Sequence, residues 1–178
     1  MASKFARDEL EKVAVEVEKN DQPPSRDIVK KFAKQGLLGV NLQTKYGGGG
    51  LGHLEAVLVL EEISKFSIAS AFTVFESCFG PILAIEHFGP EEIREWIIPQ
   101  VCDGEAIVTV AMAEPDAGSA LTNLKTQAVR KGDEWVLFGT KRWCSEVGHA
   151  DYYVVYCRMS DVKGAKGIGS VLVSKNQT

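Results

Sequence analysis

Two short segments of this chain carry residues whose types and spacing suit the binding of an anion and of a flat aromatic ring. The first segment runs from Ala111 to Ala120 and reads AMAEPDAGSA. Its composition predicts a tight turn after an apolar strand, and Ser119 could open a short helix there. Backbone N–H groups around Gly118 and Ser119 would then point outward and could hold a phosphate group. The same residues also fit an ordinary strand-turn-helix connection.

The second segment ends in a tryptophan beside a hydroxyl side chain. A turn at Gly132 leads into a predicted strand from Trp135 to Trp143, and Cys144 and Ser145 follow it. Trp143 offers a flat apolar surface, while Ser145 and the neighbouring backbone offer hydrogen-bonding groups. An isoalloxazine ring needs both, because it is a planar aromatic system whose edges carry donors and acceptors. The two segments together favour a flavin site.

The stretch from Phe5 to Ser174 resembles the acyl-CoA dehydrogenase family in the order and spacing of three motifs. These motifs read AEPDAGS, GDEWVLFGTKRW and HADYYVVY. Two further segments are similar to the family and read KQGLLGVNLQTKYGGGGLG and EHFGPEEIREWIIPQVCDGEAI. The resemblance implies FAD as the cofactor and α,β-dehydrogenation of an acyl-CoA thioester. In that reaction a carboxylate removes the α-proton, and the β-hydrogen leaves as a hydride to the flavin.

The resemblance also implies which residues contact the flavin and the substrate. Ser119 matches a position near the phosphopantetheine arm of the acyl-CoA. The implied flavin-contacting residues are Val110, Ala111, Met112, Ala113, Glu114, Gly118, Ser119, Trp143, Cys144 and Ser145. Two positions depart from the family, because Ala113 stands where Thr or Ser is usual and Ala120 where Asp is common. A lost hydroxyl contact costs about 0.5 to 1.5 kcal/mol, so we expect altered flavin tuning rather than lost binding.

No residue of this chain is assigned as a catalytic base. The resemblance implies a Glu from a C-terminal helical domain, and this sequence ends at Thr178. We interpret Glu114 as a residue that shapes its turn, because a single carboxylate with no visible partner gives no reason to expect a tuned pKa. The default for four glutamates in predicted helices is a solvated or capping role: Glu61, Glu62, Glu76 and Glu86.

Composition narrows the function classes and the compartment. The chain has 178 residues, is 45% hydrophobic and has a formal net charge of −4, which argues against a nucleic-acid surface. The four cysteines show no C-x-x-C pairing and no metal-ligand spacing with histidine, so no metal site is predicted. The opening residues lack an apolar signal segment. We expect a cytoplasmic protein without a membrane span, with the mitochondrial matrix as the alternative compartment.

Hydrophobic periodicity predicts an antiparallel helical domain over residues 1–105. Apolar residues at helical spacing predict the first helix from Lys4 to Lys19. The run from Gly47 to Gly50 predicts a mobile loop, and it lacks the Lys and Ser/Thr of a P-loop. Pro81 should kink the apolar fourth helix. The later helices are expected from Ser25 to Gln35, from Leu54 to Phe66, from Ser70 to His87 and from Pro90 to Cys102.

From Ala106 onward the pattern changes to strands. Connections too short for helical crossovers predict an incomplete antiparallel β-barrel or sandwich domain over residues 106–178. The expected fold class is therefore α+β, without the C-terminal helical domain of the family and with an exposed sheet edge. The expected strands run from Ile107 to Met112, Lys125 to Arg130, Trp135 to Trp143, Tyr152 to Arg158 and Gly167 to Val173.

Taken together, these patterns predict the first part of an FAD-dependent acyl-CoA dehydrogenase, with a weak flavin site and no activity on its own. The resemblance implies an acyl-CoA substrate, electron-transfer flavoprotein as the electron acceptor, and a homodimer or homotetramer at full length. Two alternatives stay open. A flavin oxidase or monooxygenase of the same fold would differ in its use of oxygen, and a noncatalytic binding module would lack the base altogether.

Overall fold

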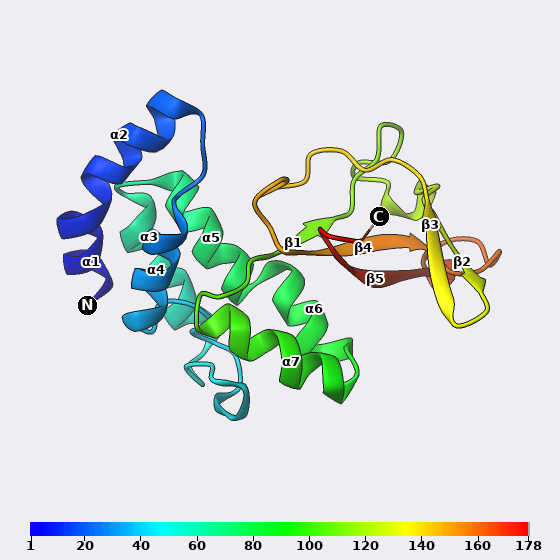
Figure 1. The fold of residues 1–178 in the computed structure, drawn as a ribbon, viewed down its shortest axis with the longest axis horizontal. Helices are drawn as coiled ribbons and strands as arrows, with labels where there is room; N and C mark the ends of the chain where they lie inside the picture. Colours follow the sequence, from blue (N-terminus) through cyan, green and yellow to red (C-terminus); the bar gives the residue numbers. More distant parts are fainter. Residues whose placement is uncertain (178) are drawn as a thin grey trace. The chain divides into compact units, whose positions relative to one another are not determined.

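The computed structural model describes residues 1–177 and divides them into two compact units (Figure 1). The first unit runs from Met1 to Val108, and the second begins at Thr109. Thr178, the last residue of the expected β domain, lies outside the described residues. Each unit has its own set of buried apolar side chains, so the fold consists of two separately packed bodies.

The first unit is helical, and apolar side chains at helical spacing explain why. In α3 the side chains of Ile28, Val29 and Phe32 are buried, whereas the lysines that lie between them are exposed. The first predicted helix is present as two α-helical stretches joined by a π-helical turn at Ala6–Leu10. The α-helices are α1 (Ala2–Phe5), α2 (Glu11–Asn20), α3 (Arg26–Lys34), α4 (His53–Ser64), α5 (Ile68–Cys78), α6 (Gly80–Phe88) and α7 (Glu91–Cys102).

The apolar segment predicted as one kinked helix is two helices, α5 and α6. The break falls at Phe79, whose dihedrals of φ −124° and ψ −75° are not helical, and Pro81 stands in the first turn of α6. Pro81 does not kink a helix, because a residue in the first turn needs no partner for its missing N–H. By length and composition Ile68–Phe88 could cross a membrane, but more than half of its most apolar window is buried in the unit. We interpret the segment as core, since core helices meet the same length and composition criteria.

The glycine-rich segment between α3 and α4 is a turn held by main-chain hydrogen bonds. The Gly49 N–H donates to the Gly39 carbonyl at 2.9 Å, and the Leu51 N–H donates to the Val40 carbonyl at 3.0 Å. A Cβ added to Gly49 would lie 2.5 Å from the Val40 carbonyl oxygen, closer than packed atoms allow. Glycine is needed there for this close approach of two backbones. The segment is therefore a hydrogen-bonded turn and not the loosely held loop expected from its composition.

The strands form one five-stranded sheet with mixed pairing. The strand order is β1-β4-β2-β3, and β5 pairs with β4 outside that path. The β2–β3 and β4–β5 pairs are antiparallel, but β2 pairs with β4 in parallel through Gln127 and Arg158. The expectation of a purely antiparallel domain is corrected on this point. The strands are β1 (Val108–Ala111), β2 (Gln127–Lys131), β3 (Glu134–Phe138), β4 (Tyr152–Arg158) and β5 (Ile168–Ser174).

Two local expectations about the β unit are wrong. Strand β3 ends at Phe138, so Trp143 lies in the loop that follows and has a left-handed backbone with φ 58°. The short helix expected to open at Ser119 is one 3-10 turn over Leu121–Asn123. A turn of three residues has almost no aligned peptide dipoles. The predicted anion site at Gly118 and Ser119 therefore loses the support of a helix N-terminus.

Candidate functional site

The two segments predicted to bind flavin lie side by side in the β unit, with opposite chain directions. The Thr109 hydroxyl donates to the Ser145 carbonyl at 2.8 Å, and the Arg142 N–H donates to the Ala113 carbonyl at 2.9 Å. Sequence numbers rise along the first segment while they fall along the second. The stretches bounded by these two contacts hold five of the predicted cofactor residues: Val110, Ala111, Met112, Trp143 and Cys144.

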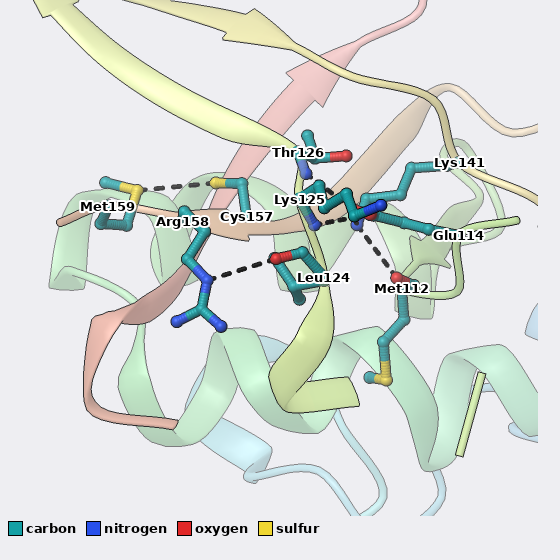
Figure 2. A network of polar contacts seen from close by, with 9 residues as sticks. All are labelled: Met112, Glu114, Leu124, Lys125, Thr126, Lys141, Cys157, Arg158 and Met159. Atoms are coloured by element: carbon teal, nitrogen blue, oxygen red, sulfur yellow. Dashed lines mark hydrogen bonds and ion pairs between the residues drawn. The ribbon is translucent and has the colours of Figure 1, made fainter. Parts of the chain in front are cut away.

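A buried ion pair joins the same two segments (Figure 2). Glu114 Oε1 lies 2.8 Å from Lys141 Nζ, and the two side chains are only 6% and 11% exposed. Lys141 Nζ also donates to the Met112 carbonyl at 3.0 Å. The Glu114 carboxylate accepts the backbone N–H groups of Lys125 at 2.6 Å and Thr126 at 2.9 Å. We call these contacts of Glu114 and Lys141 the clasp, because they hold three stretches of chain together.

The clasp keeps the Glu114 carboxylate ionised. Burial raises the pKa of this group, but the hydrogen bond from Lys141 and the donors at Lys125 and Thr126 lower it more strongly, from 4.5 to about 2. A carboxylate with so low a pKa is a poor proton acceptor near neutral pH. Glu114 therefore has the contacts of a residue that shapes its turn and not the protonation behaviour of a general base.

The turn after Glu114 leaves its tip open. Glu114 and Ala117 exchange backbone hydrogen bonds of 2.9 and 3.2 Å, which close the turn. Gly118 and Ser119 follow and are exposed. A Cβ added to Gly118 would meet no atom within 4 Å. The space beside Gly118 is thus not used by the packing of the turn. A ligand that approaches the backbone closely needs such an open space.

Trp143 presents a large flat surface to solvent. Its side chain is 79% exposed, which is unusual for an indole with so much apolar area. The Arg142 guanidinium lies 4.5 Å from the centroid of its ring, a cation–π contact that steadies the indole. An exposed indole held in place in this way can stack on a planar ligand. Stacking would bury its apolar surface and add an aromatic contact. This geometry suits the role predicted for Trp143.

Cys144 and Ser145 are half-buried beside Trp143. Burial raises the pKa of the Cys144 thiol, with Lys141 acting weakly in the opposite direction, so the thiol stays protonated at neutral pH. A protonated thiol is a weak nucleophile. All four cysteines are free thiols, and no group of three metal-ligating side chains gathers within residues 1–177.

The expectation for the helical glutamates holds for two of them and fails for the other two. Glu61 and Glu62 lie at the surface and pair with Lys65 at 4.0 and 2.5 Å. Glu76 and Glu86 are instead buried, at 3% and 5% exposed. Glu86 Oε1 accepts the Gln43 N–H at 2.8 Å and so anchors the glycine-rich turn. A partner 43 residues away gives no local signal, which is why the burial of Glu86 was not predicted.

Lys141 is the site residue that sequence reasoning missed. Its ammonium satisfies a buried carboxylate and also binds the Met112 carbonyl, and it lies two residues before Trp143. A signal was present in the GTKRW motif, where a lysine stands two residues before the first residue assigned to the flavin in this segment. Recognising it required knowing that Glu114 is buried, because only a buried carboxylate demands a partner of opposite charge.

A helical unit that leads into a small β unit with this paired site defines an α+β protein, the class predicted from the sequence. Residues 1–105 match the family model described as acyl-CoA dehydrogenase, N-terminal domain. Residues 109–178 match the model described as acyl-CoA dehydrogenase, middle domain. The chain therefore belongs to the acyl-CoA dehydrogenase family.

Similar proteins are longer than this chain. A mitochondrial isovaleryl-CoA dehydrogenase of Pongo abelii is 34% identical over 176 residues, which cover 97% of this chain and 42% of the relative. An acyl-CoA dehydrogenase structure from Geobacillus kaustophilus superposes with a TM-score of 0.88 at 30% identity, covering 98% of this chain and 46% of that one. A structure of PigA with FAD and proline superposes with a TM-score of 0.89 at 26% identity, with the same coverage. The chain thus spans less than half the length of these proteins.

Proposed function

We propose that this chain provides the flavin-binding part of an FAD-dependent acyl-CoA dehydrogenase. The observation that carries the proposal is the pairing of the two predicted flavin segments through the Arg142–Ala113 hydrogen bond, with the exposed face of Trp143 beside them. Family membership supports it, and so does the FAD in the similar PigA structure. Bound FAD supplies the hydride acceptor that no protein side chain can provide.

The residues of this chain would bind and orient the flavin and the substrate. Trp143 would stack on the ring system, and the backbone from Val110 to Ala113 would line its edge. Ser145 keeps a hydroxyl at that edge, while Ala113 brings none. Ser119, exposed next to the open space at Gly118, would contact the arm of the acyl-CoA.

The proton-accepting carboxylate would come from outside the present 178 residues. Glu114 is held ionised by the clasp with a pKa of about 2, and Glu86 is occupied by a backbone N–H. We further propose electron-transfer flavoprotein as the electron acceptor and a homodimer or homotetramer for the full-length protein, as the family resemblance implies. The cytoplasm is the proposed compartment, with the mitochondrial matrix as the alternative, because the four free thiols suit a reducing environment.

A related chemistry on the same fold is the second candidate. The PigA structure holds FAD with proline, which is not a thioester, so the fold admits other substrates. In that case the flavin segments would be used in the same way, and the reaction would be set by residues that lie elsewhere. A noncatalytic binding module is the third reading, and it would share the binding surface without turnover.

The test begins with the protein isolated from its natural source, by native mass and visible absorption spectrum. Flavin bands at one FAD per chain support the proposal, and anaerobic addition of straight and branched acyl-CoA thioesters should then bleach them. Rapid recovery of the colour in air without a second protein would favour an oxidase. Bound flavin that no thioester bleaches would favour another substrate or a binding module. Protein isolated without flavin, and unable to take up added FAD, would contradict the proposal.

A further inference from the structure

The clasp is the most deeply buried charged contact of the β unit, and its bonds all converge on one short stretch of chain. The Lys141 ammonium reaches the Met112 carbonyl and the Glu114 carboxylate, and the next residue, Arg142, holds the Ala113 carbonyl. Three consecutive residues of the first segment are thus each bound to one of two consecutive residues of the second. Such a set of contacts permits one relative placement of the segments, because sliding either by one residue would break all three.

The other contacts of the clasp join Glu114 to residues further along the same loop. The Glu114 carboxylate receives the N–H groups of Lys125 and Thr126, eleven and twelve residues further along the chain. The exposed tip with Gly118 and Ser119 lies within the stretch of chain between Glu114 and Lys125 that these bonds close into a loop. One buried carboxylate therefore fixes both the base of the turn and its distance from the second segment.

The geometry of Trp143 depends on the residues immediately before it. A left-handed backbone is uncommon for a bulky residue and persists only where neighbouring contacts determine it. On its N-terminal side the nearest such contacts are those of Arg142 and Lys141, one and two residues earlier. The orientation of the indole face is therefore tied to the clasp, although neither Glu114 nor Lys141 lies on that face.

We propose that Glu114 and Lys141 are positioning residues, which fix the loop that carries Trp143 relative to the Met112–Ala113 backbone, so that the indole can face a flavin ring while the backbone lines the edge of that ring. The inference rests on the proposed flavin function of these segments. Lys141 would act through Arg142 and Trp143, and Glu114 through Lys141. Removal of the lysine charge should then loosen flavin binding more than it loosens the sheet.

The test compares Lys141→Met with Lys125→Met. Both variants replace an ammonium by a thioether of similar length in the same unit, but the Lys125 ammonium only pairs with Asp116 at the surface, where both side chains are about three-quarters exposed. FAD affinity is measured by quenching of flavin fluorescence, and the exchange rates of backbone amides are measured by NMR without FAD. Lys141→Arg serves as the conservative variant that should restore the charge.

Lys141→Met should weaken FAD binding about tenfold or more, and Lys125→Met should leave it within about twofold. The Arg142 amide should exchange about tenfold faster in Lys141→Met, while amides shared by β4 and β5 change much less. A merely structural role would instead speed exchange across the whole sheet to a similar extent. Lys141→Arg should recover most of the FAD affinity.

Equal FAD affinity in the wild type and in a folded Lys141→Met protein would overturn the inference, as would an unchanged Arg142 exchange rate. If the wild type takes up no FAD, the proposed function fails, and the exchange pattern alone then decides whether the clasp positions Trp143. If Lys141→Met does not fold, Glu114→Gln takes its place, because it keeps the shape and one acceptor oxygen. A uniform rise in exchange across the sheet in that variant would equally overturn the inference.

Discussion

The two turns that follow buried elements in this chain, one in each unit, are held by different physical means. In the helical unit, the glycine-rich turn is closed by main-chain hydrogen bonds between Gly39 and Gly49 and between Val40 and Leu51. In the β unit, the turn after Met112 is held chiefly by the charged side chains of Glu114 and Lys141. The glycine-rich turn needs a residue without a side chain at Gly49, and the turn after Met112 needs the side chains of Glu114 and Lys141.

The difference matches the parts that we assign to the two turns: the glycine-rich turn is structural, and the turn after Met112 belongs to the candidate site. In backbone-to-backbone closure the main-chain donors and acceptors satisfy one another, so those paired groups are not available to a ligand. Side-chain closure leaves the tip at Gly118 and Ser119 exposed. The turn after Met112 is also the more sensitive of the two to substitution. If either Glu114 or Lys141 is replaced, the other is left as a buried charge without a counter-ion.

The largest expected effect comes from breaking the clasp outright. Glu114→Ala should lower the free energy of unfolding of the β unit by about 3 to 5 kcal/mol, because Lys141 would be left buried without its counter-ion. Urea unfolding followed by tryptophan fluorescence measures the change. Asp116→Ala, which removes the partner of an exposed pair, should cost about 0 to 1 kcal/mol. A loss below about 1 kcal/mol in Glu114→Ala would mean that the clasp does not hold the turn.

The clasp should also make the β unit sensitive to acid. The folded pKa of Glu114 is lowered from 4.5 to about 2, so its contribution to stability is complete above about pH 5 and is lost as the pH falls towards 2. Over that range the wild type should lose about 3 kcal/mol more than Glu114→Gln, which has no proton to gain at this position. Parallel acid curves for the two proteins, measured by urea unfolding at each pH, would show that the carboxylate is not held ionised.

The glycine-rich turn should respond to added volume. Gly49→Ala places a Cβ against the Val40 carbonyl and should cost about 1 to 3 kcal/mol of stability in the helical unit. Gly118→Ala is the matched change in the β turn, where space is open, and it should be neutral or slightly stabilising. Far-UV circular dichroism during thermal unfolding reports both. An equal loss in the two variants would remove the distinction drawn between the turns.

The smallest expected effect concerns charge at the surface of the β turn. Lys125→Met removes the exposed pair with Asp116 but leaves the Lys125 backbone N–H on Glu114 in place. Its unfolding free energy should change by about 0 to 1 kcal/mol, and less so at high salt. Denaturation at low and at high ionic strength gives the comparison. A loss as large as that of Glu114→Ala would show that the strength of the turn comes from its surface charges.

The sequence predicted the elements well where local patterns decide them. Periodicity placed the helices of the first unit, and strand β4 was predicted with its observed bounds, because buried and exposed side chains alternate at characteristic intervals. The predictions failed where a distant partner decides the outcome. The burial of Glu86 is such a case, since its carboxylate accepts the N–H of Gln43, 43 residues earlier.

The same limit applies to the site. The motifs singled out the two segments that the structure brings together, since their glycines, Glu-Pro step and tryptophan are visible as residue types. The bond between the segments was not visible, because Lys141 pairs with a carboxylate 27 residues earlier. The predicted helix at Ser119 failed for a further reason: the loop is closed by Glu114, so only one 3-10 turn fits before Lys125.

The most direct test of the account is a titration of FAD into the purified 178-residue protein, followed by quenching of the flavin fluorescence. The account predicts saturable quenching at one FAD per chain, with the affinity lowered about tenfold by Trp143→Ala because the stacking surface is removed. Flavin fluorescence that stays unquenched at all protein concentrations would contradict the assignment of this surface as a flavin site. An affinity that does not change in Trp143→Ala would contradict the role given to the indole.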